Sequence, residues 1–134
     1  MKVYIAGRYS RRDELKGLSL KLEAMGVEVT SRWLNEKEPL DGGMDSKPGE
    51  WYRETAIVDL EDIDRADGIL LFSEDPKVGI PRGGRQVEFG YAIGTNKQIH
   101  IIGPFENIFH FLPAAKHYDD IYDFATKVGA QCHV

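Results

Sequence analysis

The chain has 134 residues, 42% of them hydrophobic, so it can bury one core and we expect a single domain over residues 1–134. Its net charge of −5 argues against a nucleic-acid polymer as partner, because proteins that bind polyanions usually carry a basic surface. The single cysteine, Cys132, excludes an internal disulfide, and no apolar run is long enough for a signal peptide or a membrane span. We therefore expect a cytoplasmic protein with no membrane partner.

The first third of the chain predicts a strand, a helix and a second strand. Residues 3–7 form a short apolar run that glycine ends, and residues 10–13 begin with a serine and end with an acid, as in a capping box. Gly26 is placed to end the helix in a left-handed turn, and residues 27–34 predict the next strand. The apolar residues at helical spacing are Leu15, Leu18, Leu22 and Met25.

Residues 35–50 are rich in glycine, proline and charge, which predicts a long loop that is either a binding loop or a plain solvated excursion. Residues 51–66 then predict a helix. Asp59 lies close to the apolar stripe of this helix, which suggests a half-buried position, but acid-rich helix surfaces are common and the pattern of Asp59 alone favours a solvated one. The stripe comprises Ala56, Ile57, Leu60 and Ile63.

The second half of the chain continues the alternation. The continuous apolar run at 69–72 predicts a strand covered on both faces. After a loop, a helix opens at Gly83 and Gly84 and extends to about Thr95. Residues 98–102 predict a fourth strand, 117–121 a weaker one, and 122–128 a last helix. This order predicts an α/β fold: a doubly wound, mainly parallel sheet of four or five strands with helices on both faces, flavodoxin-like or Rossmannoid.

Ligands of such sheets bind beyond the carboxyl ends of the strands. The loop after the first strand and the turn at residues 82–85 therefore converge, with Glu88 close behind that turn. Arginines would make this edge locally basic, which suits a phosphate or another small anion unless they are simply solvated. These arginines are Arg8, Arg11, Arg12, Arg82 and Arg85.

Glu88 lies in the first turns of its predicted helix, where the partial positive charge of the helix start favours an ionised carboxylate. This setting suggests a carboxylate nucleophile, and the ordinary alternative is a glutamate that stabilises its own helix. If Asp59 faces the same cleft, the two carboxyl groups form the minimum equipment for cleaving a bond to an anomeric carbon through a covalent intermediate.

Other chemistries find less support. Residues 79–84 fit neither a phosphate-binding P-loop nor a dinucleotide fingerprint, because the glycine spacing is wrong. The histidines lack metal-ligand spacing, and Ser10 and Ser73 lack the context of a hydrolase nucleophile. We expect no metal and no cofactor.

Three stretches resemble the nucleoside 2-deoxyribosyltransferase family, including its relatives that hydrolyse the N-glycosidic bond of nucleoside 5′-monophosphates. They are residues 3–7 (VYIAG), residues 59–63 with 66–70 (DLEDI and ADGIL), and residues 84–92 (GRQVEFGYA). The third is similar to the family pattern Gly-x-x-x-Glu-hydrophobic-Gly-x-Ala. The resemblance covers roughly residues 3–113.

The resemblance implies that Glu88 attacks the sugar C1′ and displaces the base, forming a glycosyl ester that a second base or water resolves. Tyr4 would orient the glutamate or the sugar, and Asp59 would contact the base or assist its departure. The partners would be a nucleoside or nucleotide and a free nucleobase. The substrate-binding residues that we expect are Gly7, Arg8, Arg82, Gly83, Gly84, Arg85, Asn107 and His110.

Several alternatives stay open at this point. Some transferases of the family place acids where this chain has Arg82 and Arg85, so a 5′-phosphate and hydrolysis are a second possibility. A nucleotide-binding domain without chemistry is a third. The resemblance also implies a homo-oligomer of two or more subunits. The apolar segment 107–113 is our candidate for the subunit contact, and its alternative is packing onto its own domain.

Overall fold

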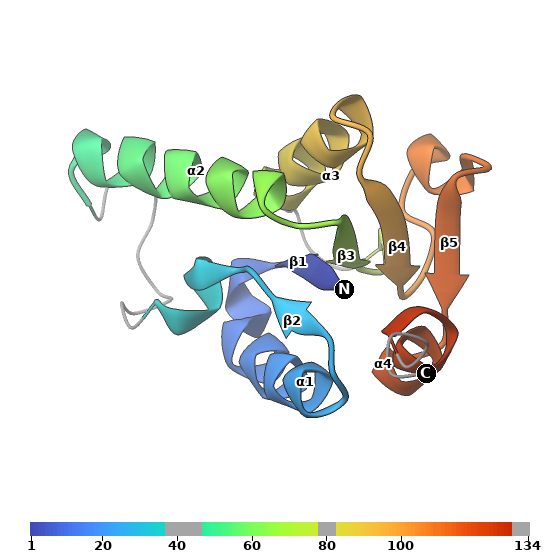
Figure 1. The fold of residues 1–134 in the computed structure, drawn as a ribbon. Coiled ribbons are helices and arrows are strands. Elements are labelled where there is room, and N and C mark those ends of the chain that lie inside the picture. Colours follow the sequence, from blue (N-terminus) through green and yellow to red (C-terminus); the bar gives the residue numbers. More distant parts are fainter. Residues whose placement is uncertain (37–46, 78–82, 130–134) are drawn as a thin grey trace.

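The computed structural model describes residues 1–36, 47–77 and 83–129. Five parallel strands form one sheet in the order β2-β1-β3-β4-β5, which confirms the predicted doubly wound fold (Figure 1). The strand order reverses beside β1, where a switch in strand order usually marks the ligand site. The strands are β1 (Lys2–Ala6), β2 (Glu28–Val29), β3 (Gly68–Phe72), β4 (Gln98–Ile102) and β5 (Ala115–Tyr118).

Helices cover both faces of the sheet. Helices α2 and α3 lie over one face, and α1 and α4 over the other (Figure 1). The helices are α1 (Arg12–Ala24), α2 (Gly49–Asp64), α3 (Gly84–Gly94) and α4 (Ile121–Phe124). Single-turn 3-10 helices occupy loops at η1 (Tyr9–Arg11), η2 (Arg32–Asn35) and η3 (Ile108–Phe111), and a π-helical turn, η4 (Ala125–Gly129), continues α4.

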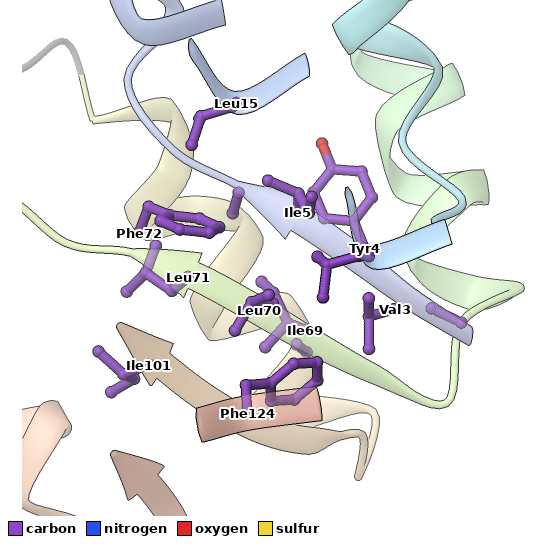
Figure 2. Close-up of a cluster of buried hydrophobic side chains, with 14 of the residues drawn as sticks. Val3, Tyr4, Ile5, Leu15, Ile69, Leu70, Leu71, Phe72, Ile101 and Phe124 are labelled. Carbon is purple, nitrogen blue, oxygen red and sulfur yellow. The ribbon is translucent and has the colours of Figure 1, made fainter. Parts of the chain in front are cut away.

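The core is centred on β1 and β3. All five residues of β3 are buried, as its continuous apolar sequence predicts for a strand covered on both faces. Figure 2 shows side chains of β1 and β3 packed together with Leu15 of α1, Ile101 of β4 and Phe124 of α4. Burying each such side chain contributes about 1.5–3 kcal/mol, so this cluster fixes the position of both strands.

The second strand is much shorter than predicted, because side chains replace its backbone hydrogen bonds. The Ser31 hydroxyl accepts a hydrogen bond from the Ile5 N–H at 2.6 Å, and the Trp33 indole N–H donates to the Ile5 carbonyl at 2.8 Å. With both backbone groups of Ile5 satisfied in this way, the chain leaves the sheet after Val29 and turns into η2.

Other boundaries also differ. No side chain caps α1, so the predicted capping box at residues 10–13 is wrong, whereas Gly26 ends the helix in the left-handed region (φ 90°) as predicted. β5 begins two residues before the predicted strand. The predicted apolar stripe of α2 is only partly correct, because Ala56 and Ile57 are exposed and Ile63 is buried. Most of the predicted loop 35–50 lies outside the described residues.

Within the described ranges, no helix is long and apolar enough to cross a membrane.

Candidate active site

Three side chains from three different elements meet between the sheet and the helices above it. Tyr4 comes from β1, Asp59 from α2 and Glu88 from α3. The Tyr4 hydroxyl donates a hydrogen bond to Glu88 Oε2 at 2.8 Å, and the carboxyl group of Asp59 interacts with that of Glu88. The residues that the sequence predicts as catalytic therefore lie together, although they are up to 84 positions apart in the chain.

Local structure explains this convergence. Tyr4 lies in the middle of β1, where its ring is fully buried, and Figure 2 shows its hydroxyl directed away from the strand. Glu88 shares the sheet-facing side of α3 with Arg85, Phe89 and Ala92, which recur at helical spacing and are buried. Gly83 allows the chain to enter α3 through the left-handed region (φ 90°), a conformation that favours glycine.

Burial dominates the electrostatics of the two carboxyl groups. Burial and the negative charge of Asp59 raise the pKa of Glu88 to about 8, although the Tyr4 hydrogen bond opposes the change. Burial also raises the pKa of Asp59 to about 6, while its hydrogen bond to Glu88 lowers it. Burial and the second acid therefore oppose the ionised form of Glu88 that the helix start is expected to favour.

The pair can carry a single proton near neutral pH, as two interacting carboxyl groups do. Burial and the charge of Glu88 raise the pKa of Tyr4 well above its usual range, so Tyr4 remains a neutral hydrogen-bond donor. Its bond to Glu88 stabilises the ionised form of that residue. Asp59 Oδ1 is buried without a hydrogen-bond partner, which leaves it able to hold the proton or to accept a bond from a ligand. The arrangement thus offers one nucleophile and one acid.

The predicted substrate-binding glycines are placed as follows. A Cβ at Gly7 would lie 2.6 Å from Leu15 Cδ1, so a larger residue there would have to displace the end of the Leu15 side chain. Gly83 and Gly84 begin α3, and a Cβ on Gly84 would meet nothing within 4 Å. Their contacts with a substrate stay predictions.

Most of the predicted basic edge is neutralised. Arg11 pairs with Glu14 and Glu74, and buried Arg85 pairs with Glu106. Arg12 is buried, and it donates a hydrogen bond to the Tyr9 hydroxyl at 2.9 Å. Within the described part of the chain, Arg8 keeps a partly exposed side chain with no ion-pair partner. Arg82 lies outside the described residues.

The last two predicted substrate contacts, Asn107 and His110, make structural contacts within the chain. Asn107 caps η3 by accepting from the Phe109 N–H, and its amide donates to Gln86 at 3.3 Å. His110, within η3, is fully buried and packs against Phe89, and its contact with a substrate stays a prediction. Around them, the apolar segment is largely solvent-exposed rather than packed onto its own domain. Its exposed members are Ile108, Phe109, Phe111 and Leu112.

The sequence around Glu106 contains no motif that indicates a role for this residue. It lies two residues after Pro104 in the loop that follows β4 and is buried against the first turn of α3. No group of three or more metal-ligating side chains occurs within the described ranges.

Comparison with known proteins supports the fold assignment. No family model matches the chain, and no curated protein sequence matches it. Among solved structures, a 2-deoxyribosyltransferase from the psychrotolerant bacterium Bacillus psychrosaccharolyticus is similar with a TM-score of 0.72 and 20% identity, over 98% of this chain and 95% of that one. A CMP N-glycosidase from Clostridium botulinum has a TM-score of 0.56 and 17% identity, over 96% and 98%.

A conserved protein from Enterococcus faecalis V583 is also similar, with a TM-score of 0.50 and 14% identity over 93% of this chain and 84% of that one. At these identities the likeness shows the fold. The chain therefore has the fold of a 2-deoxyribosyltransferase and of a CMP N-glycosidase, the two kinds of enzyme that its sequence resembles.

Proposed function

We propose that the protein cleaves the N-glycosidic bond of a 2′-deoxynucleoside through a covalent glycosyl–Glu88 intermediate and transfers the deoxyribosyl group to another nucleobase. The observation that carries this proposal is the cluster of buried Tyr4 with half-buried Asp59 and Glu88 beside the switch in strand order. The fold neighbours support nucleoside glycosyl cleavage in general terms, since they are a 2-deoxyribosyltransferase and a CMP N-glycosidase.

In the first half-reaction the ionised carboxylate of Glu88 attacks the sugar C1′. A new C–O bond forms as the C1′–N bond breaks, and the bonding electrons leave with the base. Because the pKa of Glu88 is the higher of the two, the shared proton first moves from Glu88 to Asp59, and Asp59 then gives it to the departing base, which leaves as a neutral molecule. Tyr4 keeps Glu88 in its ionised, correctly aimed form through their 2.8 Å hydrogen bond.

The second half-reaction reverses these steps. A nitrogen of the incoming base attacks C1′, the ester bond to Glu88 breaks, and Glu88 regains its carboxylate. The proton that the incoming base loses returns to Asp59. The sugar develops positive charge in both transition states, and 2-deoxyribose favours this because it lacks the electron-withdrawing 2′-hydroxyl.

Hydrolysis of a (deoxy)nucleoside 5′-monophosphate to free base and sugar phosphate is the second candidate. Its specific support is Arg8, a cation in the loop after β1 that has no ion-pair partner in the described part of the chain. Against it, the positive charges of Arg11 and Arg85 are already neutralised by acids. We therefore rank it below deoxyribosyl transfer.

One experiment separates these functions. The protein is incubated with a panel of deoxynucleosides and their 5′-monophosphates, with and without a second free base, and base release and exchange are followed by chromatography. Base exchange without net hydrolysis supports the transferase, and release from monophosphates alone supports the hydrolase. Binding of these compounds without any release of base would overturn both, and would indicate a nucleotide-binding domain. Glu88→Gln serves as the inactive control.

The expected homo-oligomer is supported by the exposed apolar side chains of η3. Ile108 is 77% exposed and Phe111 69%, and apolar patches of this kind usually mark a contact with another protein. Light scattering after size-exclusion chromatography would measure the mass in solution. A monomer at all concentrations would contradict this part of the proposal.

A further inference from the structure

Helix α3 carries the proposed nucleophile, but the sequence of the helix contributes little to its own stability. Three of its eleven residues are glycines: Gly84, Gly90 and Gly94. Only Gly90 lies in the helix interior, where glycine costs about 1 kcal/mol relative to alanine, and short helices depend on tertiary contacts for their stability. No side chain caps the helix start. The placement of Glu88 must therefore come from contacts that α3 makes with the rest of the molecule.

Glu106 supplies such a contact at the first turn of α3. Its carboxylate accepts hydrogen bonds from the Arg85 guanidinium and from the Gln86 side-chain amide, the latter at 3.2 Å. It also accepts from the Glu74 backbone N–H at 3.0 Å, in the loop after β3. The side chains of Glu106 and Arg85 are only 7% and 4% exposed, so water does not compete for this ion pair.

The same network reaches further loops. The Asn107 amide donates to the Gln86 side chain, which ties η3 to the first turn of α3. The Glu74 carboxylate accepts from Arg11 at 2.6 Å, in the loop after β1. The loops that follow β1, β3 and β4 are thus joined through Glu106 and Glu74 at the carboxyl edge of the sheet.

The Glu106 backbone N–H donates to His110 Nδ1 at 3.2 Å, and the His110 ring packs against Phe89 with centroids 5.2 Å apart. Phe89 is the neighbour of Glu88 in the chain, and Arg85 lies three residues before Glu88 on the same sheet-facing stripe. Contacts of residues 106–110 therefore bracket the nucleophile on both sides along the helix.

We propose that Glu106 is a positioning residue, which fixes the first turn of α3 through Arg85 and Gln86 and thereby aims Glu88 at the sugar. This inference rests on the function proposed above. A buried ion pair is a poor source of stability, because an apolar pair of similar size is often as stable. Its directional hydrogen bonds are better suited to holding one helix turn at one angle against three loops.

The test compares Glu106→Gln with Glu106→Asp and with Tyr91→Phe. Circular dichroism at the assay temperature first establishes that each variant is folded. Tyr91→Phe is the matched control, because it removes a 2.6 Å hydrogen bond to Asp64 at the far end of α3. A misplacement of about 1 Å can cost about 100-fold in rate, so Glu106→Gln should lower kcat about 10- to 100-fold with KM within about threefold of wild type. Glu106→Asp keeps the charge and should recover part of kcat, and Tyr91→Phe should leave both constants unchanged.

A wild-type kcat in Glu106→Gln would overturn the inference, as would an equal loss in Tyr91→Phe. If Glu106→Gln does not fold, Gln86→Ala removes the bonds to Glu106 and Asn107 at less cost, and a wild-type kcat there would also overturn it. An inactive wild-type protein would instead contradict the proposed function itself, so the two failures are distinguishable.

Discussion

Asp59 and Asp62 lie three residues apart on α2, the first half-buried and the second buried, and their surroundings differ. Asp62 is fully buried and accepts hydrogen bonds from the Arg32 backbone N–H at 2.9 Å and from the Arg32 and Arg65 guanidinium groups at 2.8 and 2.6 Å. Asp59 has a carboxyl group for a neighbour, Glu88, and its Oδ1 has no hydrogen-bond partner. The charge of Asp62 is therefore compensated by its hydrogen bonds to arginine, whereas Asp59 faces a second acid.

The difference separates a structural acid from one equipped for chemistry. Two arginines balance the charge of Asp62, which ties η2 to α2. A buried acid facing another acid costs stability, and such costs are concentrated at functional sites. The predictions below test whether Asp62 serves structure and Asp59 serves the reaction, and what the residues around Glu88 contribute to each.

Replacing Glu88 should have the largest effect on activity. Glu88→Gln removes the proposed nucleophile, and losing a nucleophile typically costs several orders of magnitude, so kcat should fall at least about 1,000-fold. The assay is base exchange between a deoxynucleoside and a second base. Activity near that of wild type would remove Glu88 from the mechanism.

The same variant should be more stable than wild type at neutral and alkaline pH. Because folding raises the pKa of Glu88 from 4.5 to about 8, the unfolded chain loses this proton first, and the free energy of unfolding falls as pH rises between these values. Glu88→Gln escapes this loss and should gain about 1–3 kcal/mol, the cost of an imperfectly compensated buried polar group. Thermal denaturation at pH 5 and pH 9 measures it, and a gain that does not grow with pH would contradict the raised pKa.

Asp59→Asn should lower kcat about 100- to 1,000-fold, the usual contribution of a general acid. Wild type should show a bell-shaped profile of kcat against pH, because activity needs Glu88 ionised and one proton on Asp59. With pKa values of about 6 and about 8 for the pair, the maximum should lie between them. In Asp59→Asn only Glu88 titrates, so the alkaline limb should disappear and a single acid limb should remain. An unchanged profile would leave Asp59 with base recognition alone.

Asp62→Asn should affect stability rather than chemistry. It weakens the hydrogen bonds of two guanidinium groups to a buried carboxylate, so the free energy of unfolding should fall by about 1.5–3 kcal/mol. The kcat of the folded protein should stay within about tenfold of wild type, since Asp62 touches neither Glu88 nor Tyr4. Chemical denaturation and the exchange assay measure the two effects. A rate loss equal to that of Asp59→Asn would erase the contrast between the two acids.

Tyr4→Phe should lower the rate less than Glu88→Gln or Asp59→Asn does. It removes one hydrogen bond to a carboxylate, worth about 1.5–3 kcal/mol, so kcat should fall about 10- to 100-fold. Because this bond lowers the pKa of Glu88, the acid limb of the pH profile should move to higher pH. An acid limb at the wild-type position would show that Tyr4 does not stabilise ionised Glu88.

Much of the fold is predictable from local patterns. β4 occupies residues 98–102 as predicted, and β3 and α3 lie within a residue of their predicted limits, because apolar runs ended by glycine leave few alternatives. The early end of the second strand is not predictable in this way, since it depends on hydrogen bonds from Ser31 and Trp33 to Ile5, which are distant in sequence.

The candidate site is also predictable only in part from the sequence. The meeting of Tyr4 and Glu88 follows from the family resemblance and from the strand order that a doubly wound sheet requires. Which of the neighbouring acids faces Glu88 depends on the rotation of α2, and sequence spacing alone does not distinguish Asp59 from Asp62. The pairing of Arg85 with Glu106 joins residues 21 positions apart, so nothing local reveals that this arginine is neutralised.

The most direct test of the central claim is mass spectrometry of the protein itself. Wild-type protein turning over a deoxynucleoside is quenched in acid and digested, and the peptide that contains Glu88 is analysed. The account predicts a deoxyribosyl ester on Glu88 that disappears when a second base is added to consume it. Release of base with no adduct, or with an adduct on a different residue, would contradict it.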